Sequence, residues 1–267
     1  MVLLSLGAGV QSSTMALMAA CGELSPTPHA AIFADTQGEP REVYEWLSWL
    51  ERQLPFPVVR VTSGDLAKLS VIPKVTRDGQ RSYLKHSVPA FIVNPDGSKG
   101  MARRQCTRDF KIDPIRRAVK KLGASAKAPC EMWIGISTDE ATRMKPSQHA
   151  GQIHRWPLIE KEMSRTDCLE WMERHNFPLP PKSACTFCPY HSDELWTGMS
   201  SSDQQFAIDY ENKLQAAYSE STALKGVPFL HSSRIPLSQV LENLKSGKQQ
   251  PAKDDLFDEE CEGMCGV

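Results

Sequence analysis

The sequence predicts an α/β fold: a doubly wound parallel sheet of about five strands, followed by a helical extension that carries cysteines. Short apolar runs alternate with segments of helical periodicity, which is typical of a parallel sheet covered by helices on both faces. The first apolar run also ends in a glycine-punctuated turn, Gly7-Ala8-Gly9, directly before a helical segment. A chain of 267 residues, 40% of them hydrophobic, is long enough for one large domain with a small appendage.

The individual elements follow from apolar periodicity and from residues that begin or end helices. Short apolar runs between turns predict strands at residues 2–6, 30–34, 57–61, 131–136 and 153–158. Pro40 suits the first turn of a helix, Asp113-Pro114 is an N-cap followed by proline, and Gly123 ends that helix. Helices are expected at residues 11–20, 39–53, 65–70, 113–122, 166–175 and 203–218.

These elements divide the chain into three parts. Residues 1–163 are expected to form the α/β domain. Within it, Gly, Pro and Asn interrupt residues 73–105, which predicts a long insertion loop. Residues 164–246 are expected to form the helical extension. Residues 247–267 are expected to be a flexible tail that contains Cys261 and Cys265.

The charges of the chain balance overall but not locally. There are 31 Lys and Arg against 32 Asp and Glu, so no global charge attracts the chain to nucleic acid. Residues 99–127, however, contain ten basic residues and two acidic ones. In the predicted helix 113–122 the basic side chains face away from the apolar ones, and a solvated surface is the simplest interpretation. Those in or beside the long loop are expected to contact phosphate, sulfate or nucleic acid; they are Arg103, Arg104, Arg108 and Lys111.

Eight cysteines are too few for a disulfide scaffold of this size. The amino terminus lacks the positively charged segment of a signal peptide, and no run of about 18 apolar residues is found. We therefore expect no membrane segment and a cytoplasmic location, where thiols stay reduced and clustered cysteines bind metal or do chemistry. Cys21, Cys130 and Cys168 are expected to be buried packing residues.

The glycine turn is the first candidate for chemistry. A glycine-rich loop between a strand and a helix exposes backbone N–H groups and the positive helix end, which together can hold an anion. Hydroxyls at Ser12, Ser13 and Thr14 add donors. The loop is neither a P-loop, since no Lys follows it, nor a complete dinucleotide fingerprint, since the third Gly is missing. By itself it could equally be a structural turn.

Further motifs follow the glycine turn in a fixed order. Phe33-Ala34-Asp35-Thr36 ends the second strand, the segment 106–112 precedes the Pro114 helix, the segment 135–143 follows the fourth strand, and Trp156-Pro157-Leu158 precedes another helix. This series resembles the PAPS reductase/DndC family of the PP-loop, or adenine nucleotide alpha-hydrolase-like, superfamily. The resemblance covers roughly residues 1–190 and implies a sheet of the PP-loop (HUP) type.

The resemblance implies a nucleotide site on the glycine turn. The family's loop Ser-Gly-Gly-x-Asp-Ser falls on residues 7–12, with Gly7, Ala8 and Gln11 departing from it. Binding by backbone N–H groups survives such changes better than hydrolysis does. The residues expected to bind nucleotide, phosphate or sulfate are Ser5, Gly7, Ala8, Gly9, Gln11, Ser12, Ser13, Asp35, Thr36, Gly135, Asp139 and Glu140.

The cysteines add a candidate metal site. Cys185 and Cys188 form a C-x-x-C pair, which commonly binds zinc or an iron–sulfur cluster. Iron–sulfur members of the family have further cysteines about as far before this pair as Cys106 is here, so the resemblance implies a 4Fe-4S cluster on these three thiols. Zinc is the alternative, with His191 able to complete a tetrahedral site. For the cluster, the fourth ligand is Cys261, Cys265 or an open position.

The resemblance also implies the catalytic groups. Reductases of this family carry a nucleophilic cysteine in a carboxy-terminal Glu-Cys-Gly segment, which Cys261 and Cys265 each match in part. That thiol would attack sulfur, and Arg108, Lys111 and Arg143 would neutralise the charge that develops on the transferred group.

The function predicted from this resemblance is that of an adenosine-nucleotide-binding enzyme of sulfur metabolism, similar to PAPS or APS reductases. Its substrate would be adenylylated sulfate and its reductant a thiol partner such as thioredoxin. The first alternative is an ATP-dependent sulfurtransferase that thiolates tRNA or DNA, taking sulfur from a donor and holding nucleic acid through residues 99–127. The second is a nucleotide-binding module without hydrolysis. Mg²⁺ is a further candidate cofactor.

Overall fold

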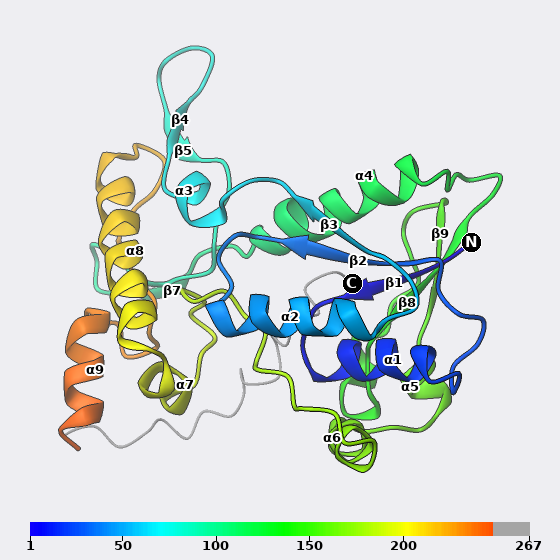
Figure 1. Ribbon diagram of the computed structural model, residues 1–267. Helices are drawn as coiled ribbons and strands as arrows, with labels where there is room; N and C mark the ends of the chain where they lie inside the picture. The colour runs from blue at the N-terminus through cyan, green and yellow to red at the C-terminus, as the bar shows by residue number, and fades with distance from the viewer. Residues whose placement is uncertain (248–267) are drawn as a thin grey trace. The chain divides into compact units, whose positions relative to one another are not determined.

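The computed structural model describes residues 1–247 (Figure 1). These residues form two compact units, which we call the sheet unit and the cysteine unit. The sheet unit contains Met1–Ser63 and Phe110–Ala184, and the cysteine unit contains Gly64–Asp109 and residues 185–247. The division therefore runs differently from the predicted bounds, because residues 64–109 group with the carboxy-terminal helices.

The sheet unit contains one five-stranded sheet in the order β3-β2-β1-β8-β9. Every neighbouring pair in it is parallel. Its strands are β1 (Val2–Leu6), β2 (Ala30–Asp35), β3 (Val58–Thr62), β8 (Cys130–Ile134) and β9 (Gln152–Arg155). The α/β fold class and the five-stranded parallel sheet are confirmed. The last strand ends before the predicted position because Pro157 begins a helix, α5 (Pro157–Glu160).

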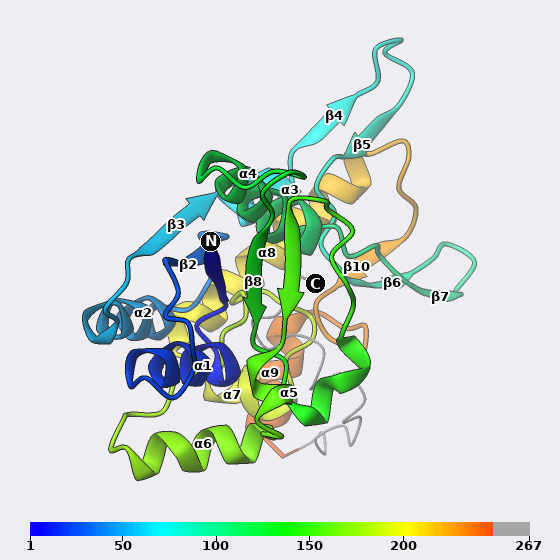
Figure 2. The same cartoon turned by 90° about the vertical axis from the view of Figure 1, so that its right-hand side faces the viewer.

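Helices cover both faces of this sheet (Figure 2). Successive strand residues point to opposite faces, so Leu4 packs in one core and Leu3 in another. The Leu4 core includes residues from α1 (Val10–Ala20), α2 (Arg41–Gln53) and α6 (Arg165–Arg174). The Leu3 core includes Ala118 and Val119 of α4 (Asp113–Lys121). The continuous apolar runs of β1 and β2 reflect burial on both faces.

The connections reverse direction at β1. From β1 the chain proceeds outward through β2 to β3, and it then returns to pair β8 with the other side of β1. The carboxyl ends of β1 and β8 therefore lie side by side where the strand order changes direction. Ligands of open parallel α/β sheets bind outside the carboxyl ends of the strands at such a point.

The cysteine unit begins with α3 (Leu66–Ser70) and two hairpins. The hairpins pair β4 (Pro73–Val75) with β5 (Ser82–Leu84), and β6 (Phe91–Val93) with β7 (Lys99–Met101). The predicted insertion loop at residues 73–105 thus contains two hairpins, which the sequence analysis did not predict. Each strand is only three residues long, too short for alternation to be recognised. The turn dipeptides Asp78-Gly79 and Asp96-Gly97 were the available signals, and both glycines have positive φ.

Three helices and one strand complete this unit: α7 (Asp193–Gly198), α8 (Ser201–Glu220), β10 (Val227–Phe229) and α9 (Leu237–Lys245). The strand β10 adds to β6 and gives a sheet in the order β10-β6-β7. The helix predicted at residues 203–218 corresponds to α8. Within residues 1–247, no helix has both the length and the apolar character required to span a membrane.

A buried carboxylate in α8 holds the segment that follows it. Glu211 is 1% exposed, and its two oxygens accept hydrogen bonds from the backbone N–H groups of Leu230, at 2.8 Å, and Leu237, at 2.7 Å. Burial raises the pKa of Glu211, while these two N–H groups oppose the rise. Glu211 therefore joins α8 to the start of α9 and supplies acceptors to two buried donors.

The pH dependence of stability should report on Glu211. Because its pKa is raised by folding, its contribution is complete below the ordinary Glu pKa of about 4.3 and is lost as the pH rises through the folded value. Glu211→Gln cannot ionise, so its free energy of unfolding relative to the wild type should increase between about pH 4 and pH 7. Denaturant unfolding at several pH values measures this difference. Glu220→Gln, an exposed change in the same helix, is the control; a difference independent of pH would contradict the assignment.

Candidate functional site

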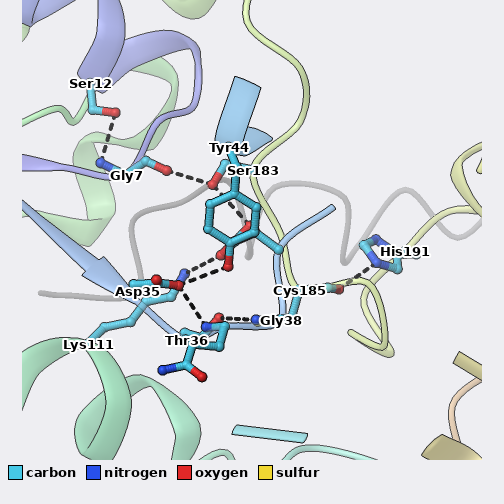
Figure 3. A network of polar contacts seen from close by, with 12 residues as sticks. Gly7, Ser12, Asp35, Thr36, Gly38, Tyr44, Lys111, Ser183, Cys185 and His191 are labelled. Carbon is cyan, nitrogen blue, oxygen red and sulfur yellow. Dashed lines mark hydrogen bonds and ion pairs between the residues drawn. The ribbon is translucent and has the colours of Figure 1, made fainter. Parts of the chain in front are cut away.

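The glycine turn joins β1 to α1 at the carboxyl edge of the sheet. Gly9 is the N-cap residue of α1, and no side chain caps this helix end. Ala8 is fully buried in a left-handed conformation with φ of 60°, one that glycine adopts more easily. The Gly7 N–H donates to Ser12 Oγ at 3.1 Å, so the first turn of the helix folds back onto the loop (Figure 3). The result is a helix amino end without a side-chain cap, directly after a parallel strand.

Gly135, at the end of β8, lies directly against this helix end. A Cβ atom at residue 135 would lie 2.9 Å from Ser12 N and 3.0 Å from Ser12 Cα. Only a residue without a side chain allows β8 to approach the backbone of α1 this closely. The predicted site residues Gly7, Ser12 and Gly135 are therefore brought together by the pairing of β1 with β8.

A buried ion pair lies next to the glycine turn. Lys111 Nζ is 3.5 Å from Glu39 Oε1, and the Glu39 side chain is 1% exposed. The Ser183 hydroxyl donates to the Gly7 carbonyl at 2.6 Å and lies 3.3 Å from Glu39 Oε2 (Figure 3). Three separate segments thus meet at Gly7. A buried pair of this kind requires partners for both charges, and here Glu39 and Lys111 supply them to each other.

The Lys111 side chain also lines a small pocket at the carboxyl ends of β1 and β2. The other residues that line this pocket are Ser5, Leu6, Gly7, Phe33, Ala34 and Ile115. The pocket combines a lysine, an adjacent helix amino end and the apolar side chain of Phe33. Its volume of about 20 Å³ is enough for one small group, such as an oxygen of a phosphate or sulfate.

Asp35 and Thr36 shape the turn after β2. Asp35 Oδ1 accepts from Tyr44 Oη at 2.8 Å and from Gln37 N at 2.7 Å, and Thr36 Oγ1 accepts from Gly38 N at 3.3 Å. Burial, followed by the hydrogen bond to Asp35, raises the pKa of Tyr44, so its hydroxyl stays protonated and donates. These predicted nucleoside contacts therefore also hold the β2–α2 turn in place.

The segment after β8 places its predicted residues in two directions. Glu140 is buried, its Oε2 atom lies 3.5 Å from Gln11 Nε2, and it pairs with Arg143. Gln11, Glu140 and Arg143 are thus assembled at the amino end of α1. Asp139 instead accepts from the backbone N–H of Arg165 at 2.6 Å, at the start of α6. The carboxylate of Asp139 therefore helps to hold α6.

The Ser13 side chain contributes to the packing of α1 against α2. It is fully buried, and its hydroxyl accepts from Trp46 Nε1 at 3.1 Å, which joins α1 to α2. Three contributors to the site were missed by sequence reasoning: Glu39, Tyr44 and Ser183. Glu39 stands three residues after Thr36, a position that could have indicated it, whereas no local pattern marks Ser183.

The C-x-x-C pair belongs to the cysteine unit. Cys188 N donates to Cys185 O at 2.8 Å, so the two cysteines flank one tight turn, and His191 Nε2 lies 2.9 Å from Cys185 O (Figure 3). Tyr210 is almost fully buried beneath this group and bonds to Ser70 at 2.8 Å. Burial raises the pKa of Tyr210, and its hydrogen bond with Ser70 opposes the rise.

The described residues do not form a complete metal site. Within residues 1–247, no group of three or more His, Cys, Asp or Glu side chains is arranged to share one metal ion.

The predicted catalytic residues fall in different parts of the chain. Arg108 is exposed in the cysteine unit, whereas Lys111 lies in the sheet unit. The predicted nucleophiles Cys261 and Cys265 lie outside the described residues.

The remaining cysteines follow the packing prediction in two cases of three. Cys130 and Cys168 are fully buried, and burial raises the pKa of the Cys168 thiol to about 12. Cys21 is exposed at the end of α1, so its predicted burial is wrong. Because Cys21 is the C-cap residue of α1 and this helix end is exposed, its side chain does not pack into the core.

Comparison with known proteins finds similarity among solved structures. No family model matches the sequence, and no curated protein matches it significantly. Among solved structures, the chain is similar to phosphoadenylyl-sulfate (PAPS) reductase from Candida auris in a phosphate complex. The two chains are 17% identical, the match covers 66% of this chain and 74% of that chain, and the TM-score is 0.42. Since this score is low, the fold class rests on the strand order and the parallel pairing described above.

The approach of Gly135 to α1 can be tested by adding a single methyl group. Gly135→Ala should displace the amino end of α1, destabilise the protein by about 1–3 kcal/mol and weaken the binding of pyrophosphate. Thermal unfolding and calorimetric titration with pyrophosphate measure the two effects. Gly198→Ala, where a Cβ atom meets nothing within 4 Å, is the matched control. A Gly135→Ala protein with the melting temperature and affinity of the wild type would show that the contact is unimportant.

Proposed function

We propose that this protein is an enzyme of sulfur metabolism that binds an adenosine nucleotide at the carboxyl edge of its parallel sheet. The phosphate or sulfate end of the nucleotide would lie at the glycine turn. The observation that carries the proposal is Lys111, which lines the small pocket beside Gly7 and pairs with Glu39. A fixed cation beside an uncapped helix end is suited to an anion that the protein binds and releases.

The ion pair with Glu39 supports this role for Lys111. The Glu39 side chain is only 1% exposed. Its carboxylate therefore orients the Lys111 ammonium group from the protein interior and leaves the solvent side of that group to an incoming anion. The Ser183 hydroxyl donates a hydrogen bond to the Gly7 carbonyl oxygen. This bond satisfies the partial negative charge of that oxygen, which would otherwise repel an anion at the glycine turn. An incoming phosphate would meet Lys111 and the amino end of α1, where positive electrostatic potential is concentrated.

The apolar and polar groups at the end of β2 suit the nucleoside. Phe33 and Ala34 line the pocket, and Asp35 and Thr36 follow them at the strand end. Asp35 is half-buried and already accepts from Tyr44, which holds its carboxylate in one orientation. It would accept a hydrogen bond from the ribose or the base. Gly135 and Gln11 would close the other side of the loop.

The reaction that fits this site best is reduction of an adenylylated sulfate. A cysteine thiolate attacks the sulfur atom, the bond from sulfur to the phosphate oxygen breaks, and the adenosine phosphate leaves with that electron pair. A dithiol partner of the thioredoxin type then attacks the cysteine sulfur, releases sulfite and becomes a disulfide, so the two electrons balance. Lys111 and Arg143 would neutralise the leaving phosphate. Cys261 and Cys265 remain the predicted nucleophiles.

The thiols of the cysteine unit would hold a metal group. Cys185 and Cys188 share one turn, and Cys106 belongs to the same unit, so these three thiols are the candidate ligands, for an iron–sulfur cluster first and for zinc second. A bound cluster would supply a redox-active group to the protein. The buried Tyr210 side chain would form part of the protein interior next to these thiols.

An ATP-dependent sulfurtransferase is the second candidate. The observation that favours it is the same set of three cysteines in one unit, since an open cluster position could hold the sulfur to be transferred. Products distinguish the candidates. Anaerobic incubation with ATP and with the two adenylylated sulfates, while pyrophosphate, AMP and sulfite are followed, should yield sulfite with a dithiol reductant if the first proposal holds. Pyrophosphate or AMP from ATP without sulfite would favour the second, and nucleotide binding without products would favour a non-hydrolytic module.

The role of Lys111 can be tested separately from turnover. Lys111→Met should weaken nucleotide binding at least tenfold, because a charge-assisted hydrogen bond is worth about 1.5–3 kcal/mol. Lys111→Arg, which keeps the charge, should restore part of the affinity. Equilibrium dialysis measures the dissociation constants, and Lys161→Met, an exposed change in the same unit, is the control. Equal affinity in Lys111→Met and the wild type would remove the lysine from the site.

The metal proposal predicts the content of anaerobically purified protein. The wild type should contain iron and acid-labile sulfide and should show visible charge-transfer absorbance, whereas Cys185→Ser with Cys188→Ser should lose most of all three. Cys21→Ser is the matched control because Cys21 is exposed and distant in sequence from the pair. Protein that contains stoichiometric zinc and no iron would contradict the iron–sulfur assignment and leave the nucleotide site untouched.

A further inference from the structure

We propose that the outer face of α4, with the grooves on both sides of it, binds the phosphate backbone of a nucleic acid. This interaction surface is separate from the nucleotide pocket and goes beyond the reductase function proposed above; it lies within residues 99–127, the range expected to hold nucleic acid in the sulfurtransferase alternative. It consists of described residues of the sheet unit alone. Its test therefore does not depend on catalysis or on a metal.

The exposed face of α4 is a ridge of positive charge. Four cations repeat along it at helical spacing: Arg116, Arg117, Lys120 and Lys121. All four are exposed, while Pro114, Ala118 and Val119 on the opposite face are buried. Residues three and four apart lie on one side of a helix, so these charges form a continuous patch. Such a local excess is notable in a chain with a formal net charge of -1.

A groove lies on each side of this ridge. The first has a volume of about 480 Å³ and runs between α4 and the start of β9, with Arg116, Lys120, His149 and Gln152 among its lining residues. The second has a volume of about 350 Å³ and lies between α4 and β3, where Arg60, Thr62 and Lys121 line it. Arg117 lines both grooves. Among the described residues that line them, Asp113 is the one carboxylate.

The contacts of these cations leave the ridge positive. Arg116 pairs with Asp113 at 3.1 Å, but this exposed pair is worth only a few tenths of a kcal/mol and exchanges readily for phosphate. Arg117 donates to the uncharged Ser63 hydroxyl at 2.8 Å, which orients its guanidinium group without neutralising it. Arg60 is bound by Glu51 through two contacts of 2.8 Å and contributes little charge to the second groove.

The length and shape of the surface favour an extended polyanion over a single small anion. The nine residues of α4 span roughly 13.5 Å, which is about four rises of a B-form strand. One phosphate ion would engage a single pair of cations. A nucleic-acid backbone presents charges at a regular interval and would engage the whole ridge, with its edges in the grooves.

The direction of α4 connects this surface to the candidate site. The helix begins two residues after Lys111, and Ile115, in its first turn, lines the small pocket together with Lys111. A strand that lay along α4 would therefore lead toward the carboxyl edge of the sheet. The solvated helix face, the simplest interpretation of the sequence, does not by itself account for the two flanking grooves.

Fluorescence anisotropy of a labelled short duplex DNA and of a labelled transfer RNA, titrated with the full chain at low salt, tests the proposal. The variant is Arg116→Gln with Lys120→Gln and Lys121→Gln, which keeps Arg117 and its bond to Ser63. The control, Lys74→Gln with Lys213→Gln and Lys225→Gln, removes the same charge from exposed positions of the cysteine unit. Only the first variant should lose affinity by tenfold or more. Its plot of log K against log salt should become shallower by about 2–3, since each phosphate contact contributes about 0.9 to the slope for duplex DNA.

Several results would overturn the proposal. They are the absence of binding to either nucleic acid at low salt, an equal loss in both triple variants, and displacement of the nucleic acid by polyglutamate at the same charge concentration. Preferential binding of the DNA or of the transfer RNA supports the proposal and shows which of the two nucleic acids the α4 surface binds. Calorimetric binding of ATP, unchanged in the first variant, confirms that its nucleotide pocket is intact and separates this inference from the function proposed above.

Discussion

The pairing of β1 with β2 on one side and with β8 on the other is the constraint on which the candidate site depends. It places the glycine turn at the position where the strand order reverses, and it brings the end of β8 against the amino end of α1. Gly135 makes this approach possible because a Cβ atom there would lie 2.9 Å from Ser12 N. The anion-binding potential of the helix end is thus a consequence of sheet topology.

A second constraint is electrostatic. The buried Glu39 carboxylate needs a cation, and Lys111 provides it from a segment 72 residues further along the chain. The ammonium group is thereby held beside the glycine turn, where an unpartnered lysine would extend into solvent. The same chain then continues into α4, so the partly buried Lys111 and the exposed cationic ridge lie in one stretch of sequence. This arrangement explains how a neutral chain concentrates positive charge along one face.

Sequence reasoning succeeded where the signal is local. The strands and helices of residues 1–62 were predicted within a few residues, because apolar runs, Pro40 and the glycine turn mark them directly. It did not predict the hairpins of residues 73–105, where β6 gains its second partner from β10, more than 130 residues later. Nor does spacing along a helix show that the Ser13 hydroxyl accepts a hydrogen bond from Trp46.

By itself the sequence determined the α/β class, the order of the motifs and the cysteine pair at 185 and 188, because each depends on neighbouring residues or on periodicity. Only the tertiary structure decided which groups meet. It joined Ser183 to Gly7 across 176 residues, turned Asp139 toward α6, and divided the cations between the pocket and the α4 ridge. The physical reason is that burial and pairing of charges are satisfied between segments distant in the chain, and no local pattern records those partners.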